Sequence, residues 1–137
     1  MSAYEADLTP AEAWELLENH EDAVLVDVRT PGEWSEVGIP DLSALGRRVV
    51  LAPIQTAMGW NSDFLGLLQQ AGISPEGDRP VLFVCRSGGR SAAAAQVATQ
   101  AGLTPSYNVT EGYEGHSSAA AGWHGSGLPT TAWEGQA

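Results

Sequence analysis

Short apolar runs, separated by polar and glycine-containing segments, dominate the hydrophobic pattern of the chain. Residues 23–28 (AVLVDV) and 80–84 (PVLFV) are bounded by polar residues and turn residues, so we expect a buried strand at each. The pattern predicts two further strands, at 48–52 and 107–109. Strands that are apolar along their whole length are typical of sheets covered on both faces.

Helical segments alternate with these strands. Thr9 and Glu12 have the spacing of a capping box, with Pro10 at the first helical position, which predicts a helix over about 10–18. Further helices are expected over 33–37, from a cap at Asn61 or Ser62 to Gly72, and over 91–101 with Gly102 as its end. The repeated strand, turn and helix predict an α/β fold in which helices cover a parallel sheet.

The 137-residue chain has the composition of one globular domain, with 43% hydrophobic and 17% charged residues. We therefore expect one domain over 1–137, with a closing segment after residue 112 and a frayed end after about Thr130. Its apolar stretches are too short to cross a bilayer, and its acidic first ten residues do not resemble a signal peptide. One cysteine cannot form an internal disulfide, so a cytoplasmic protein is expected.

Seventeen acidic and six basic residues give a formal net charge of −11. Such a surface repels phosphate groups, so neither nucleic acid nor an anionic membrane is an expected partner. All six basic residues are arginines, and two of them, Arg86 and Arg90, lie close in sequence to the only cysteine, Cys85. Positive charge is therefore concentrated beside the one thiol.

Cys85 follows the strand predicted at 80–84 and precedes the helix predicted at 91–101, where open α/β sheets bind ligands. Its neighbours are Arg86, Ser87, Gly88, Gly89, Arg90 and Ser91. The glycines allow successive backbone N–H groups to form a nest, a concave group of donors that binds an anion. Those donors, the helix dipole and the arginines favour a nucleophilic thiolate. The ordinary alternative, an inert buried cysteine, needs neither the arginines nor the glycines.

Segment 84–91 (VCRSGGRS) resembles the active-site loop of the rhodanese sulfurtransferases. Segment 27–34 (DVRTPGEW) resembles the N-terminal signature of that family, and 107–113 and 123–129 resemble its closing strand and terminal segment. The resemblance spans about 8–129. It implies a rhodanese-like α/β domain, with a central parallel sheet of about five strands, helices on both faces and a mobile tail at about 130–137.

The resemblance also implies a chemistry. Cys85 would take a sulfane sulfur from a small donor such as thiosulfate, become a persulfide, and pass the sulfur to cyanide, a thiol or a protein cysteine. Arg86 and Arg90 would bind the donor and anchor the loop, while the amides of 87–91 would stabilise the persulfide charge. No cofactor is implied. Asp27, Arg29 and Glu33 match structural positions of the signature, the first two as a partly buried ion pair at the sheet's edge.

The sequence departs from the family pattern at two loops. Segment 37–42 (VGIPDL) lacks the usual histidine, and Glu111 replaces the first of two glycines. Both changes bear on the choice of substrate more than on the chemistry. Glu111 and Glu114 are expected to be solvated carboxylates, with a hydrogen bond to a loop arginine as the alternative.

Other residue types suggest little further chemistry. The three histidines are too far apart in sequence to form a local metal motif, and no metal is expected: His20, His116 and His124. Trp14 and Trp123 are expected to fill the core, whereas Trp34 and Trp60 are candidates for the mouth of a pocket.

Two other function classes stay open. A phosphatase or arsenate reductase on the same fold would also hold a thiolate in an anion nest, and a non-catalytic binding module would need no nucleophile. Four residues separate Cys85 from Arg90, one fewer than in the phosphatase loop. The shorter ring is expected to be too tight for a tetrahedral oxyanion but wide enough for one sulfur. Cys85 and its arginines argue against the binding module.

Overall fold

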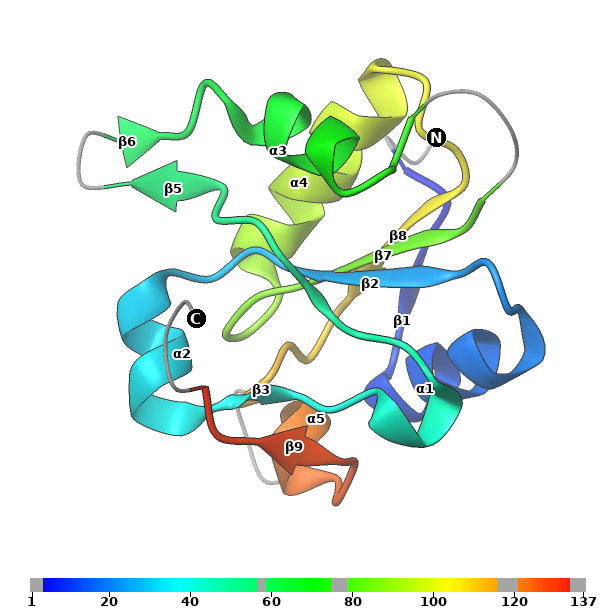
Figure 1. Ribbon diagram of the computed structural model, residues 1–137, viewed down its shortest axis with the longest axis vertical. Coiled ribbons are helices and arrows are strands. Elements are labelled where there is room, and N and C mark those ends of the chain that lie inside the picture. Colours follow the sequence, from blue (N-terminus) through cyan, green and yellow to red (C-terminus); the bar gives the residue numbers. More distant parts are fainter. Residues whose placement is uncertain (1–3, 57–58, 75–78, 116–120, 134–137) are drawn as a thin grey trace.

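The structure is a computed structural model that describes residues 4–56, 59–74, 79–115 and 121–133. Its centre is a parallel five-stranded sheet with the strand order β1-β8-β7-β2-β4 (Figure 1). These strands are β1 (Ala6–Leu8), β2 (Val24–Asp27), β4 (Val50–Leu51), β7 (Val81–Val84) and β8 (Ser106–Val109). The α/β fold with about five parallel strands, as predicted, is confirmed.

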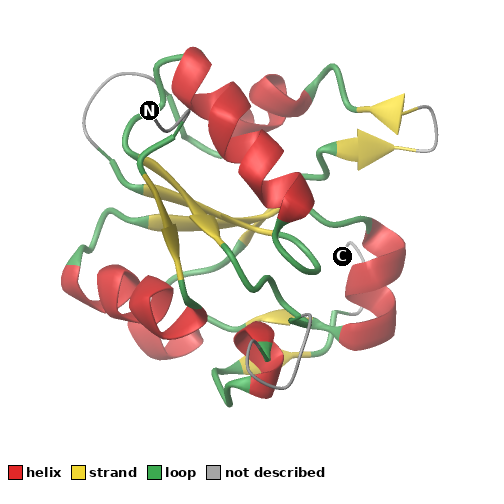
Figure 2. Ribbon diagram, turned by 180° about the vertical axis from the view of Figure 1, so that it is seen from behind, coloured by secondary structure: helices red, strands yellow, loops and turns green. Residues whose placement is uncertain are grey.

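Helices cover both faces of the sheet (Figures 1 and 2). One face carries α1 (Pro10–Asn19) and α5 (Gly122–Gly125), the other α3 (Phe64–Gln70) and α4 (Gly89–Gln100), and α2 (Pro31–Val37) follows the end of β2. None of the helices in the described ranges is long and apolar enough to span a membrane.

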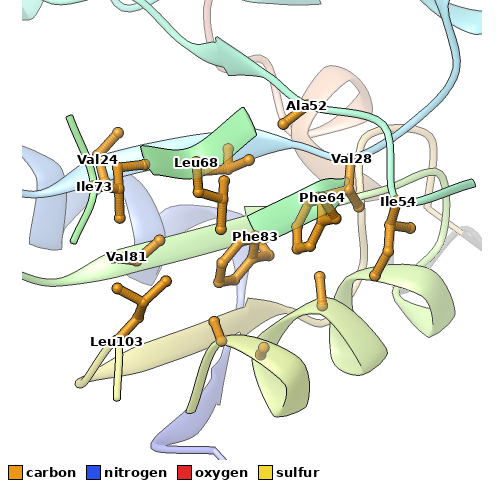
Figure 3. Close-up of a cluster of buried hydrophobic side chains, with 14 of the residues drawn as sticks. Val24, Val28, Ala52, Ile54, Phe64, Leu68, Ile73, Val81, Phe83 and Leu103 are labelled. Atoms are coloured by element: carbon orange, nitrogen blue, oxygen red, sulfur yellow. The ribbon is translucent and has the colours of Figure 1, made fainter. Parts of the chain in front are cut away.

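The two faces bury separate cores because neighbouring residues of a strand point to opposite sides of the sheet. Val81 and Phe83 of β7 pack toward α3 and α4, together with Phe64 and Leu68 (Figure 3). Leu82, the residue between them, belongs to the core under α1 and α5. Strands buried on both sides are therefore largely apolar, which explains the continuous apolar runs of the sequence.

Helix starts follow local hydrogen bonding. At α1 the capping box is present as predicted: Glu12 N–H donates to Thr9 Oγ1 at 3.1 Å, and Thr9 N–H donates to Glu12 Oε1 at 2.9 Å. Thr30 and Glu33 form a second capping box, so α2 begins at Pro31 rather than at 33. The N-cap of α3 is Asp63, not Asn61 or Ser62, which corrects the predicted start.

Two small antiparallel sheets and a 3-10 turn complete the fold. Strands β3 (Ile39–Pro40) and β9 (Thr130–Thr131) pair with each other, β5 (Gln55–Thr56) pairs with β6 (Gly59–Trp60), and the turn spans Ser43–Leu45. Strand β9 lies within 130–137, where the sequence analysis expects a mobile tail. Beyond β9, the Trp133 ring lies 5.3 Å from the Trp34 ring. Residues 134–137 of that predicted tail lie outside the described residues.

Candidate functional site

Cys85 lies directly after β7, in the loop that enters α4. The residue is 1% exposed, and its Sγ accepts a hydrogen bond from Gly88 N–H at 3.1 Å. Helix α4 begins at Gly89, two residues earlier than predicted, with Gly88 as its N-cap. The sulfur therefore lies at the N-terminal end of a twelve-residue helix, whose dipole favours negative charge there.

The segment that follows β8 makes backbone hydrogen bonds to the loop that contains Cys85. Tyr113 N–H donates to the Cys85 carbonyl at 2.7 Å, and Glu114 N–H donates to the Arg86 carbonyl at 2.9 Å. Gly112 has a φ of +70°, and a Cβ there would overlap the Arg86 carbonyl. This close approach of two backbones requires glycine, so Gly112 is a site residue that the sequence analysis did not single out.

Arg90 anchors the loop to α2. Its guanidinium makes two hydrogen bonds to the carboxylate of Glu33, both of 2.8 Å. Chiefly because of the hydrogen bond from Arg90, the pKa of Glu33 falls to about 2, against the opposing effect of burial. Glu33 also accepts from Thr30 N–H and so caps α2. One carboxylate thus fixes both the start of α2 and the first turn of α4.

Arg86 points into solvent instead. Its side chain is 64% exposed, and its Nε lies 3.4 Å from Glu114 Oε2. Glu114 thus contacts a loop arginine, which is the alternative that the sequence analysis gave to a solvated carboxylate. Glu111 accepts from Gly122 N–H at 3.1 Å, so it ties the loop after β8 to α5. Arg86 is therefore the exposed positive charge of the loop.

Asp27 and Arg29 form a fully buried ion pair of 2.7 Å, with both side chains 0% exposed. The expected partly buried pair at the sheet's edge is corrected, because β2 is an inner strand between β7 and β4. Arg29 also donates to the Gly38 carbonyl at 2.8 Å, and its guanidinium carbon lies 4.0 Å from the centre of the Tyr113 ring. The pair ties the end of β2 to the segment after α2 and to the loop behind Cys85.

A chain of polar side chains leads from the sulfur to the edge of the sheet. Ser91 Oγ lies 3.3 Å from Cys85 Sγ and 2.6 Å from Asn108 Oδ1. Asn108 Nδ2 in turn donates to Asp7 Oδ1 at 3.0 Å. Asp7 and Asn108 were missed by the sequence analysis; the available signal was the one amide, Asn108, inside the strand predicted at 107–109.

The tryptophans divide differently from the prediction. Trp123 is fully buried and Trp14 packs against it edge to face, with ring centres 5.9 Å apart. Trp34 is only 4% exposed, so the prediction of a pocket-mouth position is wrong for it; its ring is buried and packs edge to face against Trp133. Trp60 is 62% exposed and lines a hollow of about 300 Å³ between β6, α3 and α4.

The histidines do not gather. Within the ranges that the structure describes, no group of three or more histidine, cysteine, aspartate or glutamate side chains could hold a metal ion. His20 is on the surface, and His124 packs against the Tyr113 ring. His116 lies outside the described residues.

A lone cysteine between a parallel strand and a helix, with a backbone N–H directed at its sulfur, is an arrangement that characterises a class of α/β proteins. A family comparison places the chain within that class: the model of the rhodanese-like domain matches residues 9–119. The chain therefore belongs to the rhodanese-like family, as its sequence motifs predicted.

Individual relatives agree with this assignment. The crystal structure of Rv0390 from M. tuberculosis is 48% identical, covers 93% of this chain and 98% of its own, and superposes with a TM-score of 0.83. An uncharacterized protein of Rickettsia prowazekii is 33% identical over 90% of this chain and 94% of its own length. The thiosulfate sulfurtransferase GlpE of Actinobacillus pleuropneumoniae is 29% identical over 94% of this chain and 95% of its own.

One solved relative is described differently. A Rhodopseudomonas palustris protein, described as a possible tyrosine phosphatase, is 25% identical and covers 92% of this chain and 84% of its own, with a TM-score of 0.60. The same fold is thus associated with both sulfur and phosphate chemistry, and the geometry of the loop has to decide between them.

Proposed function

We propose that the protein is a sulfurtransferase that carries sulfur as a persulfide on Cys85. The observation that carries the proposal is the buried sulfur at the start of α4, which accepts a hydrogen bond from Gly88 N–H. Similarity to the thiosulfate sulfurtransferase of A. pleuropneumoniae supports it. The proposed donor is thiosulfate or another small compound with a sulfane sulfur.

The proposed reaction has two displacement steps. In the first, the Cys85 thiolate attacks the outer sulfur of thiosulfate, a sulfur–sulfur bond forms, and sulfite leaves with the electron pair of the bond that breaks. In the second, an acceptor such as cyanide, a thiol or a protein cysteine attacks the terminal sulfur, and Cys85 leaves as the thiolate. No external oxidant or reductant is needed.

The loop supplies a separate group for each charge in this reaction. Gly88 N–H and the positive end of the α4 dipole stabilise negative charge on the sulfur. Both are held in place by the fold, so they need no reorganisation during the reaction. Arg86 is exposed, so its guanidinium is available to bind the sulfonate end of the donor. The guanidinium of Arg90 is already hydrogen-bonded to Glu33, so the contribution of Arg90 is to hold the loop in place.

The phosphatase alternative requires more positive charge at the sulfur than the loop provides. A phosphate ester bound above the thiolate would need a guanidinium directed at its oxygens, and Arg90 is turned toward Glu33 at 2.8 Å. The loop is also one residue shorter than the phosphatase loop. We therefore expect negligible hydrolysis of an aryl phosphate, and robust hydrolysis by the unaltered protein would contradict the proposal.

Intact mass measurement tests the proposal directly. The fully reduced protein, incubated with excess thiosulfate, should gain the mass of one sulfur atom, and cyanide or a reducing thiol should remove it. Cys85→Ser should gain nothing, because the chain has no other cysteine. An unchanged mass of the wild-type protein would count against sulfur transfer and favour a non-catalytic binding module.

A further inference from the structure

The hydroxyl of Ser91 has a single hydrogen and three acceptors within reach. Asn108 Oδ1 lies at 2.6 Å, the Gly88 carbonyl at 3.2 Å and Cys85 Sγ at 3.3 Å. A hydroxyl group can donate only one hydrogen bond at a time. Which acceptor receives that hydrogen decides whether Ser91 stabilises a thiolate or merely faces it with lone pairs.

The orientation of the Asn108 amide settles the choice, and Asp7 fixes that orientation. Asp7 and Asn108 are register partners on β1 and β8, and Asn108 Nδ2 donates to Asp7 Oδ1 at 3.0 Å. An ionised carboxylate only accepts hydrogen bonds, so the NH₂ group must face Asp7 and the carbonyl must face Ser91. Tyr4 strengthens this arrangement, because its hydroxyl donates to the same Asp7 oxygen at 2.7 Å.

We propose that Asp7 and Asn108 are positioning residues that hold the Ser91 hydroxyl hydrogen away from the reactive sulfur. This inference deepens the proposed function, since it identifies a control on the proposed nucleophile. With the hydrogen directed at Asn108, Gly88 N–H is the donor that the sulfur retains from this set. Removing the carboxylate allows the amide to turn, and Ser91 then donates to the thiolate.

Within the part of the chain that the structure describes, three ion pairs lie on the elements around the sulfur, and none of them shares a hydrogen bond with this relay of Asp7, Asn108 and Ser91. They come from the loop, α2, α4, β2 and the segment after β8: Arg86 with Glu114, Arg90 with Glu33, and Asp27 with Arg29. A change confined to Asp7 therefore leaves each of these three pairs intact, and its effect on the sulfur must pass through the relay or through space.

The test is the pH at which the thiolate of Cys85 forms, measured by its ultraviolet absorbance. The chain has one cysteine, so subtraction of the Cys85→Ser spectrum isolates the signal. Asp7→Ala, which leaves the Asn108 amide without its acceptor at position 7, should lower the midpoint by about one pH unit, since a hydrogen bond to the charged form favours that form. Asp7→Asn keeps a carbonyl oxygen that can accept from Asn108 Nδ2, so it should shift the midpoint less. Glu5→Gln, which removes one carboxylate from the exposed segment before β1, is the matched charge control and should leave the midpoint in place.

A double-variant comparison separates the relay from a through-space charge effect. In a Ser91→Ala background, Asp7→Ala should no longer move the midpoint, because the hydroxyl that carries the effect is gone. An equal shift in both backgrounds, or no shift from Asp7→Ala alone, would overturn the proposal. The measurement requires no sulfur donor, so failure of the protein to transfer sulfur would not be mistaken for failure of the relay.

Discussion

Gly88 and Gly89 are adjacent in sequence but have different roles. Gly88 has a φ of +114° and lies against Thr110, where an added Cβ would overlap the carbonyl oxygen. Gly89 is the first residue of α4, and an added Cβ would meet nothing within 4 Å. Of the two glycines, Gly88 is the one whose N–H donates to the sulfur, and it does so in a backbone conformation that other residues rarely adopt.

Alanine at these two positions should therefore have opposite effects. We expect Gly88→Ala to lower the free energy of unfolding by about 1–3 kcal/mol through backbone strain and overlap with Thr110. Because the donor to the sulfur moves with it, sulfur loading should slow roughly a hundredfold. Gly89→Ala, the matched control, should stabilise the protein by up to about 1 kcal/mol, since alanine favours the helix. Denaturant unfolding and thiosulfate loading rates measure both, and equal losses for the two variants would contradict this assignment.

The sequence predicted the position of the sulfur but could not distinguish these glycines. A strand, a cysteine, two glycines and a helix predict an anion nest, because the donors come from the backbone and depend on local conformation. Which N–H reaches the sulfur depends on the contact of Gly88 with Thr110, a residue 22 positions away in the chain. Asn108 and Asp7 escaped notice for the same reason: their relation to Ser91 exists only after three elements have packed.

At the scale of elements, the long apolar strands and capped helices were predictable, whereas of the five two-residue strands only β4 lies within a predicted strand, that at 48–52. β2 and β7 carry enough apolar residues to be recognised alone, and Thr9 with Glu12 marks the start of α1. β3, β5, β6 and β9 have two residues each, too few to show a period. Their pairing depends on the partner strand, as with β9, which lies against β3 although Pro40 and Thr130 are 90 positions apart in the chain.

The contact between α2 and α4 is an ion pair whose contribution should depend on pH. The pKa of Glu33 is lowered to about 2 by its hydrogen bond with Arg90, from an ordinary value of 4.5. A carboxyl group with a lowered pKa stabilises the folded state fully above its ordinary pKa, and loses that contribution as the pH falls toward the folded value. The stabilisation by this pair should therefore be constant near neutral pH and disappear between about pH 4.5 and pH 2.

Glu33→Gln measures this contribution. At neutral pH the variant should be less stable by about 1 kcal/mol, a magnitude suited to a partly exposed pair. As the pH is lowered from 4.5 to 2, its stability should approach that of the wild type. Glu36→Gln, on the exposed side of the same helix, is the control and should show no such convergence. A stability difference that persists unchanged down to pH 2 would show that the negative charge of Glu33, and so its ion pair with Arg90, does not supply the stabilisation.

At the scale of the whole molecule, charge is distributed unevenly around the proposed site. α1 carries Glu12, Glu15 and Glu18, whereas α3 contains no charged residue and α4 contains only Arg90. The net charge is −11, and the exposed arginine of the loop, Arg86, lies beside Glu114. A dianionic donor therefore meets repulsion from the molecule as a whole and attraction only near the loop.

Salt should separate these two effects, because screening acts more strongly on distant charges than on close ones. The Debye length is about 30 Å at 0.01 M ionic strength and about 8 Å at 0.15 M. Raising the ionic strength over this range should remove the repulsion from remote carboxylates before it weakens the contact with Arg86. We expect kcat/KM for thiosulfate to rise roughly twofold and then to fall at higher salt.

A cationic acceptor should behave in the opposite way, because the acidic surface attracts it and salt weakens that attraction. The comparison requires two acceptors in the second step, cyanide and a protein thiol on a basic surface, each measured from 0.01 M to 0.15 M ionic strength. We expect the rate with the basic protein to decrease as salt is added while loading by thiosulfate increases. If loading by thiosulfate instead decreases steadily from the lowest salt, attraction by Arg86 already outweighs the net charge, and steering of a basic acceptor by the whole surface loses its physical basis.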